Sequence, residues 1–182
     1  WLPKWTSSSM VMMQTKSSAD SMGYLYSFDI NTKSLKKMGF GAQGLSASPN
    51  QDSTLSLLSK GGDTPTLSLL NNSSFGETPI NANSLADKCV WLGGKTPTVY
   101  CAIPNQFPEG NYPDSWYKGL VATEDSLRKI DIDNDVYYIL SDLSKESKEK
   151  IDAVDLSLPK TETHLLFKNK RDGYLWLLKI EE

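Results

Sequence analysis

Several residue types and patterns are scarce in this 182-residue chain, and each scarcity argues against a class of protein. Two cysteines and one histidine are too few for a structural zinc site, which takes four such ligands. No apolar run approaches the roughly 20 residues that a membrane-spanning helix requires. Acidic residues outnumber basic ones by 22 to 19, and the lysines are scattered, unlike those of a nucleic-acid-binding face. We therefore expect no metal, no membrane span and no nucleic-acid partner.

Catalytic motifs are equally scarce. A Ser-His-Asp hydrolase would have to use His164, the only histidine, and the sequence has no G-x-S-x-G nucleophile motif. We expect His164 to be a surface or packing residue at the start of a strand. The stretch GFGAQG at 39–44 has the glycine spacing of a dinucleotide-binding loop, but no helix follows it to receive a phosphate. We interpret it as a connection between two repeats, and we expect no catalytic residue and no cofactor.

The remaining composition is that of one folded domain, with 38% hydrophobic and 10% aromatic residues. The chain begins at Trp1 and not at methionine, and its longest apolar stretch near the start, Met10 to Met13, is too short for a signal peptide. We expect a mature or excised piece, with any export signal or anchor upstream.

Internal repeats are the strongest positive signal. GYLYSFDI at 23–30 and GYLWLLKI at 173–180 share Gly, Tyr and Leu and then alternate in the same way. Hairpin-like units precede these strands, each with a first strand, a small polar turn and an apolar strand. The units lie at 4–15, 46–59, 90–103 and 156–167.

The spacing of these units predicts the fold. Aligning Trp5, Ala47 and Trp91 gives spacings of 42 and 44 residues, and the longer step to Leu156 indicates an insertion of roughly 20 residues. A period of about 40–45 residues with four short strands is typical of a β-propeller blade, which buries its two faces by stacking on its neighbours. A β-sandwich is the alternative, because it also has regularly spaced strands.

We therefore expect an all-β chain made of four-stranded antiparallel blades, about 3.75 of them. This count favours a fragment of a longer propeller over a small closed ring or a pair of chains that complete each other. The expected blades span 1–45, 46–87, 88–152 and 153–182, with an insertion loop at 104–126.

The repeat also resembles a known family. The Ser-Pro-Asn turn of SASPNQDSTLSLLS at 46–59 and the later hairpin GYLYSFDINTKSLKKM at 23–38 are similar to repeats of TolB-type (PD40, WD40-like) propellers. The segment from Cys89 to Asp133 also resembles uncharacterised propeller proteins of candidate-phylum bacteria. The usual Asp-Gly turn is replaced by Asn50-Gln51 and Gly93-Gly94. The resemblance implies the propeller fold and no specific ligand.

The two cysteines are twelve residues apart, which is not the spacing of a C-x-x-C motif. If a hairpin turn centres on Lys95, Cys89 and Cys101 are direct cross-strand neighbours, with Cβ atoms about 4.5–5.5 Å apart. They would then form a disulfide in an oxidising compartment. The alternative is a pair of reduced thiols in a cytosolic core.

Two polar stretches each permit two interpretations. DIDND at 131–135 resembles the start of a calcium loop, but Val136 and Asp142 occupy the positions where an EF-hand needs Gly and Glu. We interpret it as a hairpin turn. SKESKEKID at 144–152 suits either a short surface helical turn or a solvated linker between blades.

The insertion at 104–126 is the candidate recognition feature, because long loops are often functional and Tyr and Trp dominate binding hot spots. The alternative is that its rings pack on their own blade and order the loop. The candidate binding residues are Phe107, Glu109, Tyr112, Asp114, Trp116 and Tyr117.

Together these features predict an extracytoplasmic binding or scaffold module, secreted or at the cell surface, with a protein or glycan partner and no enzymatic activity. Remaining blades of a parent chain, or a second copy, would complete the propeller. The alternative is a propeller-type enzyme or the propeller half of a larger hydrolase or peptidase.

Overall fold

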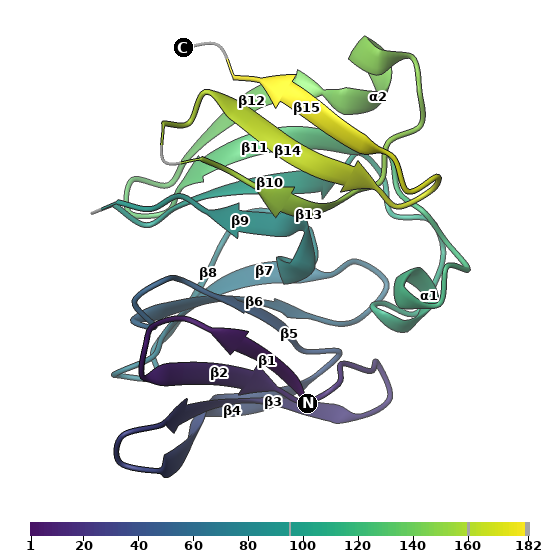
Figure 1. The fold of residues 1–182 in the computed structure, drawn as a ribbon. Helices are drawn as coiled ribbons and strands as arrows, with labels where there is room; N and C mark the ends of the chain where they lie inside the picture. The colour runs from purple at the N-terminus through teal and green to yellow at the C-terminus, as the bar shows by residue number, and fades with distance from the viewer. Residues whose placement is uncertain (95, 160, 181–182) are drawn as a thin grey trace. The chain divides into compact units, whose positions relative to one another are not determined.

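A computed structural model describes residues 1–94, 96–159 and 161–180. Within these residues, fifteen strands form four antiparallel sheets, and each sheet is a meander in which consecutive strands are neighbours (Figure 1). The first three sheets have four strands and the last has three. Lys95, on which the predicted hairpin turn was centred, lies outside the described residues.

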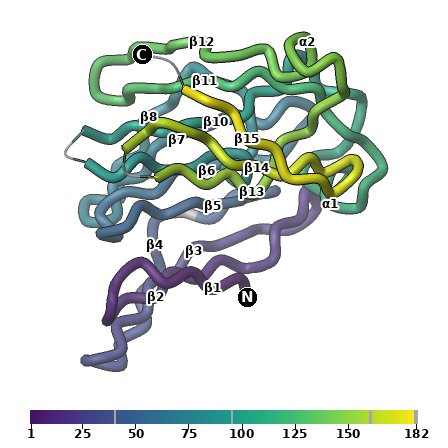
Figure 2. Tube along the Cα trace, turned by 45° about the horizontal axis from the view of Figure 1, so that its top comes forward, coloured from purple at the N-terminus to yellow at the C-terminus, as the bar shows by residue number. Residues whose placement is uncertain are grey.

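The first two sheets come from the N-terminal half of the chain, and the path of the first can be followed in Figure 2. The strands of the first sheet are β1 (Leu2–Trp5), β2 (Met10–Gln14), β3 (Met22–Asp29) and β4 (Ser34–Gln43). Those of the second are β5 (Ser46–Pro49), β6 (Leu55–Lys60), β7 (Thr66–Asn71) and β8 (Glu77–Pro79). The interpretation of 39–44 as a connection was wrong, because β4 continues through Gln43.

The last two sheets follow a short 3₁₀ helix, η1 (Ala86–Lys88). The strands of the third are β9 (Cys89–Trp91), β10 (Thr98–Pro104), β11 (Asp125–Asp131) and β12 (Val136–Asp142). Those of the fourth are β13 (Ala153–Ser157), β14 (His164–Asn169) and β15 (Leu175–Lys179). Two helices of one turn, α1 (Asp114–Tyr117) and α2 (Leu143–Ser147), lie in the connections. No described helix is long and apolar enough to cross a membrane.

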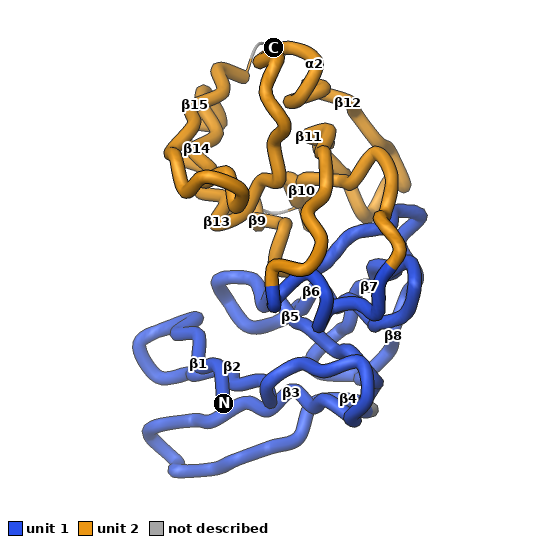
Figure 3. Tube along the Cα trace, turned by 90° about the vertical axis from the view of Figure 1, so that its right-hand side faces the viewer, with its two compact units in different colours: residues 1–86, 110–118 blue, residues 87–109, 119–182 orange. Residues whose placement is uncertain are grey.

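The chain divides into two compact units, each with two of the sheets (Figure 3). Unit 1 comprises residues 1–86 and 110–118, so it takes α1 from the middle of the insertion. Unit 2 comprises 87–109 and 119–182.

In both units the core lies between two sheets. In unit 1, Met12, Leu25 and Met38 of the first sheet pack with Leu58 and Leu70 of the second. In unit 2, Tyr100, Ala102 and Leu127 of the third sheet pack with Leu165 and Phe167 of the fourth. Tyr100 and Ala102 on β10, like Leu165 and Phe167 on β14, are two residues apart, so each pair projects from one face of its strand into this core. Repeated meanders stacked face to face are blades, so the predicted all-β propeller architecture is confirmed.

The two polar stretches have ordinary structural roles. Asp131 ends β11, and its carboxylate accepts hydrogen bonds from the backbone and the side chain of Asn134, as in a hairpin turn. The helical turn predicted in 144–152 is α2, whose N-terminus is capped by the side chain of Asp142. Helix α2 ends at Ser147, and Lys150 forms an ion pair with Glu124.

Candidate functional site

Unit 2 contains a cleft of about 600 Å³ between the strand ends of the third sheet and the β13–β14 connection. The third sheet contributes residues of β10, β11 and β12 and of the connection between β9 and β10. The lining residues are Leu92, Thr96, Thr98, Tyr100, Lys129, Asp131, Tyr138, Leu140, Thr161, Glu162, Thr163 and Ile180. We refer to this cleft as the Lys129 cleft.

Three side chains with direct contacts form the polar centre of the Lys129 cleft. The Tyr100 hydroxyl donates a hydrogen bond to the Glu162 carboxylate over 2.6 Å. The Lys129 ammonium lies 2.9 Å from the same Glu162 oxygen and 5.5 Å from the centroid of the Tyr100 ring. Tyr100 is buried, and its position on β10 opposite Lys129 on β11 is fixed by the antiparallel register. The arrangement therefore joins two strands of the third sheet to the β13–β14 connection.

The backbone at Glu162 is unusual. Its φ of 53° lies in the left-handed region, which costs free energy for a residue with a side chain. Its N–H donates to the carbonyl of Pro159 in a turn, at 3.0 Å. This turn directs the carboxylate to Tyr100 and Lys129, and these two hydrogen bonds offset part of the cost of the conformation.

The contacts shift the pKa of each group. Burial, with the hydrogen bond to Glu162, raises the pKa of Tyr100 to about 12. Burial opposes ionisation of Glu162, but hydrogen bonds from Tyr100 and Lys129 outweigh it and lower the pKa of Glu162. The hydrogen bond to Glu162 outweighs the effect of burial on Lys129 and raises its pKa. At neutral pH the cleft therefore contains a carboxylate, an ammonium and a neutral phenol.

The rest of the lining combines hydroxyl and apolar groups. Leu92, Leu140 and Ile180 provide apolar surface. Tyr138 is 53% exposed, so its ring is open to a ligand. Threonine hydroxyls lie at positions 96, 98, 161 and 163. Such a surface can both donate and accept hydrogen bonds and can contact an apolar ligand face.

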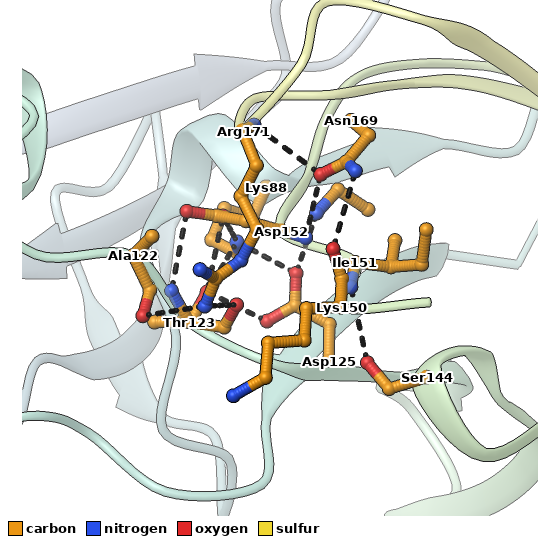
Figure 4. Close-up of polar contacts among 11 residues, drawn as sticks. Lys88, Ala122, Thr123, Asp125, Ser144, Lys150, Ile151, Asp152, Asn169 and Arg171 are labelled. Atoms are coloured by element: carbon orange, nitrogen blue, oxygen red, sulfur yellow. Dashed lines mark hydrogen bonds and ion pairs between the residues drawn. The ribbon is translucent and has the colours of Figure 1, made fainter. Parts of the chain in front are cut away.

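A second polar group in unit 2 is buried. Lys88 ends η1, Asp125 begins β11, Asp152 directly precedes β13, and Thr123 lies just before β11. The side chain of Lys88 is 1% exposed and those of both aspartates are 0% exposed. We call these four residues the Lys88 cluster, and Figure 4 shows their side chains pointing toward one another.

The Lys88 ammonium contacts the other three members of its cluster. It lies 2.8 Å from Asp125 Oδ2, 2.5 Å from Asp152 Oδ1 and 3.0 Å from Thr123 Oγ1. Burial raises the pKa of Asp125, although the nearby Lys88 charge opposes the shift. Asn169 Oδ1 accepts a hydrogen bond from the Asp152 backbone N–H, so the fourth sheet also contributes to the surroundings of the cluster (Figure 4).

The insertion residues predicted to bind a partner lie in different surroundings. Tyr112 and Trp116 are buried, whereas Tyr117 is 40% exposed. Asp114, at the start of α1, accepts a hydrogen bond from the backbone N–H of Ala19 at 2.5 Å. These four belong to unit 1, and the half-buried Phe107 and the exposed Glu109 belong to unit 2.

The Lys129 cleft does not contain any of these six residues. A separate hollow of about 440 Å³ lies next to Phe107 in sequence and is lined by Asn105, Gln106, Pro108, Ala122 and Glu124. Sequence reasoning missed Tyr100, Lys129 and Glu162. A usable signal was the alternation of β10 and β11, because it places Tyr100 and Lys129 as direct cross-strand neighbours on one face of the sheet.

The predicted disulfide is confirmed. Cys89 and Cys101 are paired in the register of β9 and β10, and their sulfurs are bonded with a Cα–Cα distance of 4.1 Å. Within the described ranges, no group of three or more His, Cys, Asp or Glu side chains is placed to hold a metal ion.

These features define the class of the protein as a β-propeller. No protein-family model matches the sequence, and no curated protein matches it. Solved structures do share the fold. TolB from Acinetobacter baumannii is similar over 99% of this chain, with a TM-score of 0.58 and 11% identity. The predicted resemblance to TolB-type propellers is therefore confirmed at the level of the fold.

Two proteases contain similar propellers. The tricorn protease matches 91% of this chain with a TM-score of 0.61 and 8% identity. The β-propeller domain of the Trilobed protease from Pyrococcus furiosus, described as having an open velcro topology, matches 100% of it with a TM-score of 0.56 and 12% identity. This chain spans 14% of the tricorn protease chain, 43% of the TolB chain and 56% of the Trilobed protease domain chain.

Proposed function

We propose that this chain is part of an extracytoplasmic β-propeller that acts as a binding or scaffold module, with the Lys129 cleft as its ligand site. The observation that carries the proposal is the Tyr100–Glu162–Lys129 arrangement, in which polar groups are held in place beside apolar side chains. Ligand sites are typically concave and apolar, with a few fixed polar groups that give specificity.

The pKa shifts favour recognition over proton transfer. A general acid or base works best with a pKa near the pH at which it operates. The pKa values of Tyr100 and Lys129 are raised and that of Glu162 is lowered, so each moves away from neutrality. Each group keeps one charge state in which it donates or accepts hydrogen bonds.

The chemistry of the lining favours a glycan over a protein partner. The ring of Tyr138 offers a flat apolar face to the C–H groups of a sugar, and the four threonines offer hydroxyls to its polar groups. Lys129, Asp131 and Glu162 add charged partners, which make stronger hydrogen bonds than neutral ones. A cleft of about 600 Å³ lies within the range of small-ligand sites, about 300–1,000 Å³.

Two further observations support an extracytoplasmic location and the presence of further blades. The Cys89–Cys101 disulfide supports an oxidising compartment, where such bonds persist. Leu166, Leu175 and Leu177 of the fourth sheet are 40%, 72% and 64% exposed, and Leu166 is paired with Leu177. A blade covers such a face with the next blade, which supports further blades from a parent chain or a second copy.

The alternative function is the propeller portion of a larger hydrolase or peptidase. Its support is the similarity to the propellers of the tricorn and Trilobed proteases. Peptidase assays on the parent protein, with this chain alone as the control, distinguish the two functions. Activity that requires this chain together with another domain would favour the enzyme.

The binding proposal is tested by titrating neutral and acidic oligosaccharides into ¹⁵N-labelled protein and following the amide resonances. We expect shifts at residues that line the Lys129 cleft, and loss of binding in Tyr138→Ala. Tyr174→Ala is the matched control, because Tyr174 is 71% exposed and directly precedes β15, whereas Ile180 follows the other end of this strand. Resonance shifts confined to residues outside the Lys129 cleft, or an equal loss of oligosaccharide binding in both variants, would contradict the glycan site. Binding of a protein partner without binding of any oligosaccharide would favour the scaffold role.

A further inference from the structure

We propose that Lys88 and Asp125 become joined by an amide bond that the folded protein forms by itself, with Asp152 as the proton acceptor. This inference concerns the Lys88 cluster and is independent of the function proposed for the Lys129 cleft.

The first support is the proximity of a buried amine and a buried carboxyl. Lys88 Nζ lies 2.8 Å from Asp125 Oδ2, and both side chains are at most 1% exposed. Groups held this close react with effective concentrations far above any reached in solution. In bulk solvent, water favours the separate acid and amine over the amide. The buried site excludes water and so favours the amide.

The second support is a count of protons. Thr123 Oγ1 lies 2.8 Å from Asp125 Oδ1 and 3.0 Å from Asp152 Oδ1, yet a hydroxyl has a single proton to donate. Both contacts are satisfied if one carboxyl is protonated and donates to Thr123. A single protonated carboxyl also leaves the Lys88 cluster neutral, whereas two carboxylates around one ammonium would leave a buried negative charge.

The surroundings identify Asp125 as the protonated member. Burial raises its pKa, which favours the neutral acid. Asp152 is better placed to remain ionised, because its Oδ1 lies 2.5 Å from the Lys88 ammonium and its Oδ2 accepts the backbone N–H of Thr123 at 3.2 Å. Asp125 Oδ2 accepts the backbone N–H of Ala153 at 2.7 Å, which polarises the carbonyl for attack.

The reaction is a condensation that balances. Asp152 takes a proton from the Lys88 ammonium, and the neutral amine attacks Cγ of Asp125. The new C–N bond forms as the C–O bond to Oδ1 breaks, and the hydroxyl leaves as water with one proton from the attacking nitrogen. The products are an amide between Lys88 and Asp125, one water molecule and a protonated Asp152.

The bond would complement the disulfide. Strand β9 has three residues, and Cys89 at its start is already bonded to Cys101 on β10. An amide from Lys88 to Asp125 would connect the residue before β9 to the first residue of β11. The short first strand of the third sheet would then be tied covalently to both of the next two strands.

The test is the intact mass of the full chain after complete reduction of the disulfide. We expect a mass lower than that of the sequence by one water molecule, about 18 Da. Proteolysis should yield a branched peptide whose fragment masses join Lys88 to Asp125. This measurement on the natural sequence decides the proposal without requiring that any variant fold.

Variants then assign the roles. Asp125→Asn should give the same cross-linked mass as the natural chain, because its amide releases ammonia where the acid releases water. Lys88→Arg and Asp152→Asn should keep their full sequence masses. Lys118→Arg is the control, since the Lys118–Asp114 ion pair is at the surface and the cross-link should be unaffected.

A natural chain with its full sequence mass, in which Lys88 is acylated after unfolding like other lysines, would overturn the proposal. A branched peptide that joins Lys88 to Asp152 would overturn the assignment of Asp125 as the residue attacked.

Discussion

Tyr100 and Glu162 lie 62 residues apart in sequence, and the hydroxyl of Tyr100 donates a 2.6 Å hydrogen bond to the carboxylate of Glu162. Tyr100 belongs to the buried strand β10 of the third sheet, whereas Glu162 belongs to the β13–β14 connection of the fourth. The contact therefore fixes a side of the Lys129 cleft only after the two sheets of unit 2 have packed together.

Replacing Glu162 by Gln should make the protein less stable at neutral pH and less sensitive to acid. The lowered pKa of Glu162 means that its carboxylate contributes stability above the ordinary pKa of 4.5, and that this contribution is lost as the pH falls through the folded-state value. Because the Glu162 side chain is one-third exposed, we expect the substitution to lower the free energy of unfolding by about 1 kcal/mol at pH 7. Urea unfolding of both proteins at several pH values between 3 and 7 measures this difference.

Glu124→Gln is the matched control, because Glu124 forms a more exposed ion pair with Lys150 and is not among the residues that line the Lys129 cleft. Equal effects of the two substitutions would show that the Glu162 contacts add nothing beyond an ordinary surface pair.

Tyr100 should ionise two pH units above an ordinary tyrosine, since burial and Glu162 raise its pKa to about 12. The folded state then holds this proton more tightly than the unfolded state, so its contribution to stability is lost as the pH rises from 10 to 12. Absorbance titration of phenolate in the natural chain and in Tyr100→Phe isolates this residue among the eight tyrosines. The difference between the two curves should be near zero at pH 10, and a transition there would show that Tyr100 is not held as described.

The fold could be predicted from the sequence because its signals are local. The spacing of Trp5, Ala47 and Trp91 reflects a repeated four-stranded meander, and each meander is one sheet of the structure. The disulfide was predictable for the same reason, since Cys89 and Cys101 are close in sequence and one hairpin register pairs them.

The Lys129 cleft could not be predicted in this way. Tyr100, Lys129 and Glu162 come from three elements, and Glu162 lies in a turn with no periodic pattern. Lys88 and Asp152 share a feature that sequence reasoning overlooked. Each is a charged residue directly before the first residue of a strand, and that first residue is buried. The sheet register and the packing of two sheets bring them together.

Asp114 should act as a structural residue of unit 1. Its pKa is lowered chiefly by the backbone N–H of Ala19, so the stability it provides is present above pH 3.8 and lost as the pH falls through the folded-state value. Asp114→Ala should lower the free energy of unfolding by about 1–2 kcal/mol, because the N–H loses a charged partner. Asp133→Ala, in an exposed turn, is the control. If Asp114→Ala weakened partner binding at unchanged stability, Asp114 would instead belong to a recognition surface.

Gly44 and Gly61 should tolerate no side chain, because their backbones touch within unit 1. A Cβ on Gly44 would overlap the Cα of Gly61, and Gly44 also has a φ of 62°. A Cβ on Gly61 would lie 2.5 Å from the carbonyl oxygen of Tyr112. That carbonyl accepts the N–H of Gly62, in the isolated bridge that attaches the insertion to the connection between β6 and β7. We expect Gly44→Ala and Gly61→Ala each to cost about 3 kcal/mol or more, since backbone atoms must move.

Gly94→Ala is the matched control for this close approach. A Cβ at Gly94 meets nothing within 4 Å, and its backbone does not have a positive φ, so we expect a change within about 0.5 kcal/mol. Thermal and urea unfolding of the three variants measure the difference. Proteolysis across 110–118 adds a local measurement, because loss of the Gly62–Tyr112 bridge should expose this segment before the protein unfolds. Equal stability of all three variants would show that the backbones at Gly44 and Gly61 are not in contact in solution.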